Sequence, residues 1–171
     1  MEFVVSQILG IIVSIAAILS MQLKNIKSIL VCQLVCNGFG ALSYILVGGL
    51  SGCGIYCVAI LQTIICFGFN VKNKKIPGLL VALFACAFLV CSLTTYKALQ
   101  DIISAVAALT CAFALAQSKA RGYRIFMLLN GLIWMLYDVS VGAYTMIISH
   151  VVTFASAIIG MIRLDFKRGC K

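Results

Sequence analysis

The chain has 171 residues, of which 64% are hydrophobic and only 10% are charged. Soluble domains have roughly 45–50% apolar and about 25% charged residues, so this composition excludes an ordinary water-soluble fold and indicates that the lipid bilayer is the solvent. The net charge of +9 does not indicate nucleic-acid binding, because the basic residues lie in short gaps between apolar runs, without a recognition-helix pattern.

Seven apolar runs follow one another along the chain, each close to the roughly 20 residues that a spanning helix needs. Pro77 opens the fourth run, where a first helical turn tolerates proline, and the first run has no basic segment before it, so we expect it to be a retained helix. The last 41 residues of the pattern, 123–163, are about twice as long as a single spanning helix. We therefore divide them into two runs at Gly142-Ala143. The runs are approximately Phe3–Gln22, Ser28–Val47, Gly54–Val71, Gly78–Thr95, Ala98–Gln117, Tyr123–Val141 and Tyr144–Arg163.

Basic residues alternate between the two ends of these runs. Twelve of the 13 Lys and Arg residues lie in the first, third and fifth gaps and after the seventh run, while Lys97 is the exception. Because cytoplasmic loops carry the Lys/Arg excess, the pattern predicts an outside N-terminus and a cytoplasmic C-terminus. The expected topology determinants, with contact to anionic lipids as a second role, are Lys24, Lys27, Lys72, Lys74, Lys75, Lys119, Arg121 and Arg124.

An internal repeat relates the second run to the sixth. Asn37-Gly38, Tyr44 and Gly49 recur as Asn130-Gly131, Tyr137 and Gly142, at an offset of 93 residues. The repeat predicts an all-α membrane protein of two parallel three-helix bundles, at 1–73 and 97–165, joined by a linker helix at 74–96 (a 3+1+3 arrangement) and followed by a basic cytoplasmic tail at 166–171. Parallel repeats are a known transporter design, with the binding site at the repeat interface near the midplane.

With this repeat, the chain resembles the SWEET and PQ-loop (MtN3-like) membrane proteins, and more closely the bacterial inner-membrane YgjV-like family, whose function is poorly defined. The resemblance covers essentially the whole chain and implies a multi-pass protein of the bacterial plasma membrane. Met21 and Ala116 replace the prolines of the PQ dipeptides, which puts in doubt a rocking motion at these points. The residues that carry the resemblance are Gln22, Lys24, Gln33, Asn37, Gln117, Lys119 and Asn130.

Asn37 and Asn130 are the leading candidates for a binding site, because each lies near the middle of its run. A buried amide in hydrocarbon needs partners and should face the bundle interior. One interpretation is a pair of amides that bind the hydroxyls or carboxylates of a substrate, as paired pocket asparagines do in sugar-transporting relatives. The other is a structural role, in which each amide links two helices by hydrogen bonds.

Weaker candidates lie on the last two runs. Trp134 and Tyr137 could line the pocket, as a stacking surface and a polar group, or serve as lipid-facing and interfacial anchors. His150, the only histidine, could couple protons to transport or form a hydrogen bond to a neighbouring helix. Asp101 and Asp138 are candidates for an outer gate or proton site, or for solvated end charges. Glu2 and Asp165 are interpreted as terminal charges without a further role.

No hydrolytic motif, phosphate loop or metal-binding spacing is present in the sequence, so we expect neither an enzyme nor a cofactor. The sequence predicts a small-solute transporter, for example of a sugar, that works as a SWEET-like facilitator with a midplane pocket between the two repeats. The alternative is a non-transporting membrane receptor or helper that binds a lipid or protein partner. Membrane lipids are the expected surroundings, and assembly as a homo-oligomer stays open.

Overall fold

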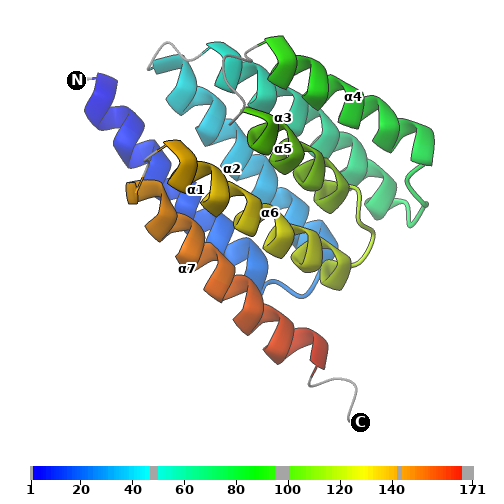
Figure 1. Ribbon diagram of the computed structural model, residues 1–171. Helices are drawn as coiled ribbons and strands as arrows, with labels where there is room; N and C mark the ends of the chain where they lie inside the picture. The colour runs from blue at the N-terminus through cyan, green and yellow to red at the C-terminus, as the bar shows by residue number, and fades with distance from the viewer. Residues whose placement is uncertain (1, 47–49, 95–100, 142–143, 167–171) are drawn as a thin grey trace.

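The computed structural model describes residues 2–46, 50–94, 101–141 and 144–166, and all of its regular structure is helical. The described residues form seven consecutive α-helices, and the axes of these helices lie side by side and roughly parallel (Figure 1). A single π-helical turn, η1, continues the last helix. The bounds are α1 Glu2–Gln22, α2 Ile26–Leu46, α3 Leu50–Val71, α4 Gly78–Thr94, α5 Asp101–Leu115, α6 Ala120–Val141, α7 Tyr144–Met161 and η1 Ile162–Phe166.

The predicted helix count is confirmed for the described residues, and most predicted ends lie within three residues of the observed ones. Pro77 precedes α4 as expected, and its carbonyl accepts the Leu80 amide at 3.0 Å. Asn73, at φ 50°, ends α3 in the left-handed conformation that helix C-termini favour. The third run was predicted to begin at Gly54, but α3 already begins at Leu50.

The helices form two layers with α4 at one edge. Helices α1, α2 and α3 pack in sequence order, as do α5, α6 and α7. Between the layers, α1 contacts α7, α2 contacts α6, and α3 contacts α5, while α4 packs on α3 and α5 (Figure 1). The chain therefore closes into a ring in which the first and last helices are neighbours.

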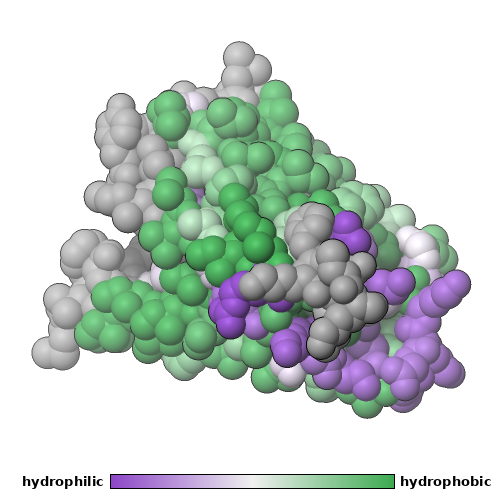
Figure 2. Space-filling view, turned by 90° about the horizontal axis from the view of Figure 1, so that it is seen from below, coloured by the Kyte–Doolittle hydropathy of each residue, from purple (hydrophilic) through white to green (hydrophobic). Residues whose placement is uncertain are grey.

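The lipid-facing surface is visible in the apolar side chains that the fold leaves uncovered. On α1, for example, Ile8, Ile11, Ile15 and Leu19 recur at helical spacing and are 53–61% exposed. A soluble protein rarely exposes such a continuous apolar stripe. Figure 2 shows the hydrophilic residues gathered in one region, while most of the coloured surface in that view is hydrophobic.

Two of the described helices are clearly long and apolar enough to cross a membrane on their own. The qualifying segments are Ile26–Ser43 in α2 and Cys53–Val71 in α3. Shorter apolar segments occur at Ile8–Gln22, Gly78–Thr94 and Ala105–Leu115. Helices α2 and α3 pack on each other, so the two qualifying segments lie side by side in the bundle.

Helices α1, α3, α5 and α7 all end on the same side of the bundle. We call this side the basic end. Lys24, Lys72, Lys74, Lys75, Lys119 and Arg121 are exposed there, and Lys27 is partly exposed. The largest buried apolar cluster also lies toward this end. Its members come from α1, α2, α3, α5, α6 and α7, and they are Met21, Ile26, Ile29, Leu30, Cys66, Ala114, Leu115, Tyr123 and Ala157.

Candidate functional site

Asn37 lies at the middle of α2 and is buried, with only 7% of its surface exposed. Its Nδ2 donates to the Thr63 Oγ1 on α3 at 3.3 Å, and the Thr63 hydroxyl donates in turn to the Ala59 carbonyl at 2.6 Å. A buried amide in an apolar surrounding requires such partners. Asn37 therefore links α2 to α3 and faces the interior, as the sequence predicts.

Gln62, beside Thr63 on α3, connects the two layers. Its side chain is fully buried, and its Nε2 donates to the Ala112 carbonyl of α5 at 2.7 Å. Its Oε1 is buried and has no hydrogen-bond partner among the described residues. This acceptor lies at the contact between the two halves of the chain, so Gln62 is a central polar residue that the sequence analysis did not single out.

Asn130 occupies the corresponding place on α6 and is 6% exposed. Its Nδ2 donates to the Ala107 carbonyl at 2.6 Å and lies 3.0 Å from the Thr110 Oγ1, both on α5. The two asparagines therefore bond to different neighbours and not to each other. Together with Gln62 they form a polar band across the middle of α2, α3, α5 and α6, buried except at the half-buried Thr110, which we call the central belt: Asn37, Gln62, Thr63, Thr110 and Asn130.

Two surface hollows among the described residues lie away from the central belt. One of ≈ 440 Å³ is at the basic end, where the connection from α5 to α6 and the start of α6 line it. Another, of ≈ 230 Å³, lies between α4 and α5 and is lined by apolar side chains and Ser92. Neither is lined by Asn37 or Asn130, because both side chains are enclosed by neighbouring helices.

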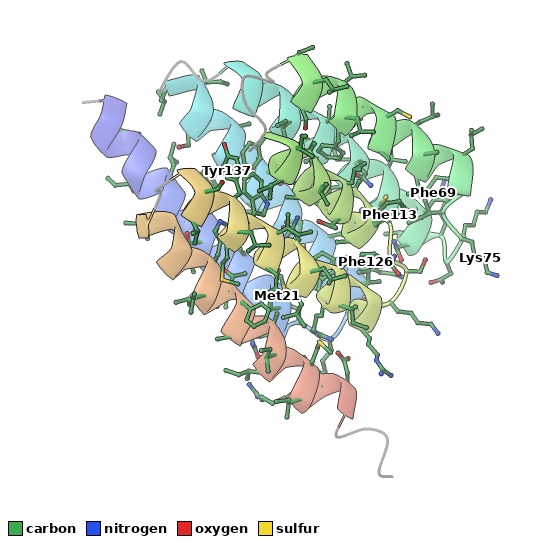
Figure 3. All side chains as sticks on the ribbon, viewed as in Figure 1. Met21, Phe69, Lys75, Phe113, Phe126 and Tyr137 are labelled. Atoms are coloured by element: carbon green, nitrogen blue, oxygen red, sulfur yellow. The ribbon has the colours of Figure 1, made fainter. Side chains whose placement is uncertain are left out.

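Three weaker candidates come together as an aromatic cluster, made of Trp134, Tyr137 and His150. The Trp134 ring stacks on the His150 imidazole with 6.1 Å between ring centroids and 3° between planes. The Tyr137 ring meets Trp134 edge-on at 5.5 Å. Figure 3 shows Tyr137 toward the opposite end of the bundle from Met21. The cluster joins α6 to α7 on the side of the belt away from the basic end.

Arg124 differs most from expectation. It was predicted as a topology determinant with lipid contact as a second role, but its side chain is fully buried and does not face lipid headgroups. Its Nη1 forms an ion pair with Asp165 at 2.8 Å, its Nε donates to the Met21 carbonyl at 2.9 Å, and its Nη2 donates to the Leu23 carbonyl. We call this arrangement the clamp: Arg124, Asp165 and the Met21 and Leu23 carbonyls. The interpretation of Asp165 as a terminal charge without a role is also wrong.

Local structure explains how the clamp forms. The last carbonyls of a helix have no partner within that helix, and Arg124 fills this need for α1. The π-helical turn after α7 carries Asp165. Gly160 lets α7 approach closely, since a Cβ there would overlap the Met21 carbonyl oxygen. The clamp thus ties the basic ends of α1, α6 and α7 together.

Further polar bonds hold α1 to its neighbours near the clamp. The Gln22 Nε2 donates to the Ser156 carbonyl at 2.7 Å and to its hydroxyl at 2.9 Å, which joins α1 to α7. On another side of α1, the Gln33 Nε2 of α2 donates to the Ser20 Oγ at 3.3 Å. Two residues that carry the sequence resemblance, Gln22 and Gln33, therefore have structural partners across helix contacts.

The two outer acidic candidates fall outside the described side chains. Asp101 begins α5 and Asp138 lies in the last turn of α6. Their side chains are not among the described ones, so the predicted gate or proton site at that end stays a prediction. Within the described part of the chain, no three His, Cys, Asp or Glu residues are grouped as metal ligands would be.

A family model described as a bacterial inner membrane protein, Imp-YgjV, matches residues 4–168. No curated protein and no solved structure matches the chain.

Proposed function

The chain belongs to the Imp-YgjV family of bacterial inner membrane proteins, and we propose that it is a small-solute transporter of that membrane. In this proposal the solute passes between the two layers, and the central belt is its binding site. The proposal includes the predicted 3+1+3 repeat, with the N-terminus outside and the basic end in the cytoplasm. The resemblance to the SWEET and PQ-loop proteins stays a prediction, and it suggests a sugar as one substrate.

The observation that carries this proposal is that the buried Gln62 Oε1, a hydrogen-bond acceptor, has no donor among the described residues. Leaving a buried acceptor without a donor costs about 1–3 kcal/mol, and native structures contain few such groups. The Gln62 Oε1 lies between α3 and α5, close to where the two repeats meet. A solute hydroxyl that donates to this oxygen would remove the penalty, so the group supports a ligand site at the centre of the bundle.

The chemistry of the belt also supports a class of solute. All of its side chains are carboxamides or hydroxyls, which are neutral and both donate and accept hydrogen bonds. The one buried charge among the described residues, Arg124, is paired with Asp165 at the basic end. A neutral interior favours an uncharged, hydroxylated solute, because an ion would be bound there without a counter-charge.

One observation favours the alternative, a receptor or helper that does not transport. Asn37 and Asn130 already have partners on neighbouring helices, as they would if their only role were to hold the bundle together. Interhelical hydrogen bonds of this kind contribute about 0.6 kcal/mol on average. A non-enzymatic role is part of both proposals.

Ligand-induced stabilisation distinguishes the two. Purified protein in detergent is unfolded by heat in the presence of monosaccharides, disaccharides, amino acids or small carboxylates. A ligand at 100 times its dissociation constant should stabilise the native state by about 2.7 kcal/mol. Asn37→Ala and Asn130→Ala should abolish the shift that a neutral sugar produces, because each removes an amide from the belt.

Asn70→Ala is the matched control for this experiment. Asn70 is also a buried asparagine, but its side chain bonds within α3, to the Cys66 carbonyl at 2.8 Å, near the basic end. This variant should keep the ligand-induced shift. If no ligand of the panel shifts thermal unfolding at tens of millimolar, the receptor or helper is favoured. The same holds if all three variants retain the ligand-induced shift.

A further inference from the structure

A hollow at the basic end lies where the chain passes from α5 to α6. It is the larger of the two hollows described above, and its volume of ≈ 440 Å³ lies within the range of about 300–1,000 Å³ for ligand pockets. Residues from the connection 116–119 and from the first two turns of α6 line it. Lys119 and Arg121 are among them, and no carboxylate is, within the described part of the chain. The hollow therefore favours an anionic ligand.

Gln117 holds the connection in this shape. Its Nε2 donates to the Phe113 carbonyl, in the last turn of α5, at 3.0 Å. A Cβ at Gly122 would lie only 2.6 Å from the Gln117 Oε1, so the carboxamide packs directly against the first turn of α6. The chain between the two helices is thus fixed by packed groups, and it presents Ser118 and Lys119 as exposed side chains.

An apolar stripe on the outer face of α6 begins at the hollow. Ile125 lines the hollow and is also the first member of this stripe. The later members follow at spacings of 4, 3 and 4 residues, which places all of them on one face of the helix. They are 40–65% exposed, as a surface in contact with acyl chains would be. The stripe consists of Ile125, Leu129, Leu132 and Leu136.

An anionic phospholipid combines the two chemistries that this surface offers. Phosphate oxygens accept hydrogen bonds from ammonium, guanidinium and hydroxyl groups, and basic pockets between membrane helices bind anionic headgroups. We propose that the hollow and the stripe form a binding site for one anionic phospholipid, the lipid site. Its phosphate lies at Ser118, Lys119 and Arg121, and one of its acyl chains lies on the stripe that begins at Ile125.

Two other lysines at the basic end show what distinguishes a site from general attraction. Lys74 and Lys75, between α3 and α4, are also exposed, but they line neither of the two hollows. Both pairs of cations attract an anionic membrane surface. A lipid that is held by net charge alone would depend equally on the two pairs, whereas a lipid in the lipid site depends on Lys119 and Arg121.

A lipid titration followed by native mass spectrometry tests the lipid site. The full chain is purified in detergent, freed of bound lipid and titrated with dioleoyl phosphatidylglycerol. Lys119→Gln with Arg121→Gln should weaken binding of the first lipid roughly tenfold or more, because each basic residue near an anionic headgroup contributes about fivefold. Lys74→Gln with Lys75→Gln, which removes the same charge at the same end, should keep the wild-type affinity within about twofold.

Two further ligands separate the headgroup from the chains. Dioleoyl phosphatidylcholine has the same chains and no net charge, so it should bind wild-type protein roughly tenfold more weakly than phosphatidylglycerol. Glycerol 1-phosphate carries the phosphate without the chains, so it should not displace phosphatidylglycerol at equal concentration. Displacement would mean a site for free phosphate compounds and would overturn the lipid site.

The remaining outcomes are equally decisive. An equal loss of affinity in the two double variants, or equal binding of the two phospholipids, would overturn the lipid site. Should the variant at 119 and 121 fail to fold, wild-type protein is crosslinked to phosphatidylglycerol with a photoreactive headgroup and mapped by peptide mass spectrometry. Crosslinks within 116–125 support the site, and crosslinks only elsewhere overturn it. None of these outcomes decides whether the protein transports, because the hollow lies away from the central belt.

Discussion

Replacing Asp165 with alanine should lower the free energy of unfolding by about 3 kcal/mol. The substitution leaves the fully buried Arg124 guanidinium without its counter-charge, while the two carbonyl acceptors remain. The effect lies at the lower end of the range for broken buried pairs, because Asp165 itself is 11% exposed. Chemical unfolding in detergent, followed by circular dichroism, measures it.

The double variant shows whether the loss comes from the unpaired charge. Arg124→Met with Asp165→Ala removes both charges, so it should be less destabilised than the sum of the single variants. Arg121→Met removes an exposed arginine of the same helix and should change stability by less than about 0.5 kcal/mol. If Asp165→Ala is as stable as wild type, the ion pair does not hold the basic end together.

Replacing Gly160 with alanine should destabilise the fold by about 1–3 kcal/mol, the range for overpacked interiors. The new methyl group would overlap the Met21 carbonyl oxygen, which is backbone and cannot rotate away, so α7 must move from α1. That movement also strains the contact of Arg124 with the same carbonyl. Chemical unfolding in detergent, followed by circular dichroism, measures this loss of stability.

Gly10→Ala is the matched control. Gly10 lies on α1 and a Cβ there would meet no atom within 4 Å, so alanine should leave stability unchanged or raise it by up to about 1 kcal/mol through helix propensity. Equal effects of the two substitutions would mean that α1 and α7 do not approach as closely as described.

The helices were predictable because each ends at a local signal. Pro77, the lysines around Asn73 and the break at Gly142-Ala143 all mark real helix ends, since these residues act through backbone geometry and charge, which sequence shows directly. The start of α3 was not predictable in this way. Glycines at 52 and 54 suggest a loop, yet they lie in a helix whose tertiary contacts outweigh a weak propensity.

The central belt was predictable in part. The repeat pointed to Asn37 and Asn130, and both are buried at the middle of their helices. It could not show that one would bond to α3 and the other to α5, because the choice of neighbour depends on packing. Gln62 was missed because Ala155 stands at its place in the second repeat, so no matched pair drew attention to it.

One feature of the sequence pointed to the clamp, namely the charge of Arg124. Arg124 lies inside an apolar run, and a charge within such a run is a functional candidate by default. Its place beside Lys119 and Arg121 made it look like one more topology determinant. Its partner lies 41 residues away on a turn after the last helix, and only the fold brings the two together.

Solute equilibration across liposomes tests whether this bundle is a transporter whose path crosses the central belt. Wild-type protein should let a neutral hydroxylated solute equilibrate faster than protein-free liposomes, and the rate should saturate with concentration. Asn37→Ala and Asn130→Ala should slow it by about fivefold or more, since each loses a hydrogen bond to the solute, while Asn70→Ala should not. A panel of sugars and polyols that equilibrates no faster than in protein-free liposomes would contradict the account.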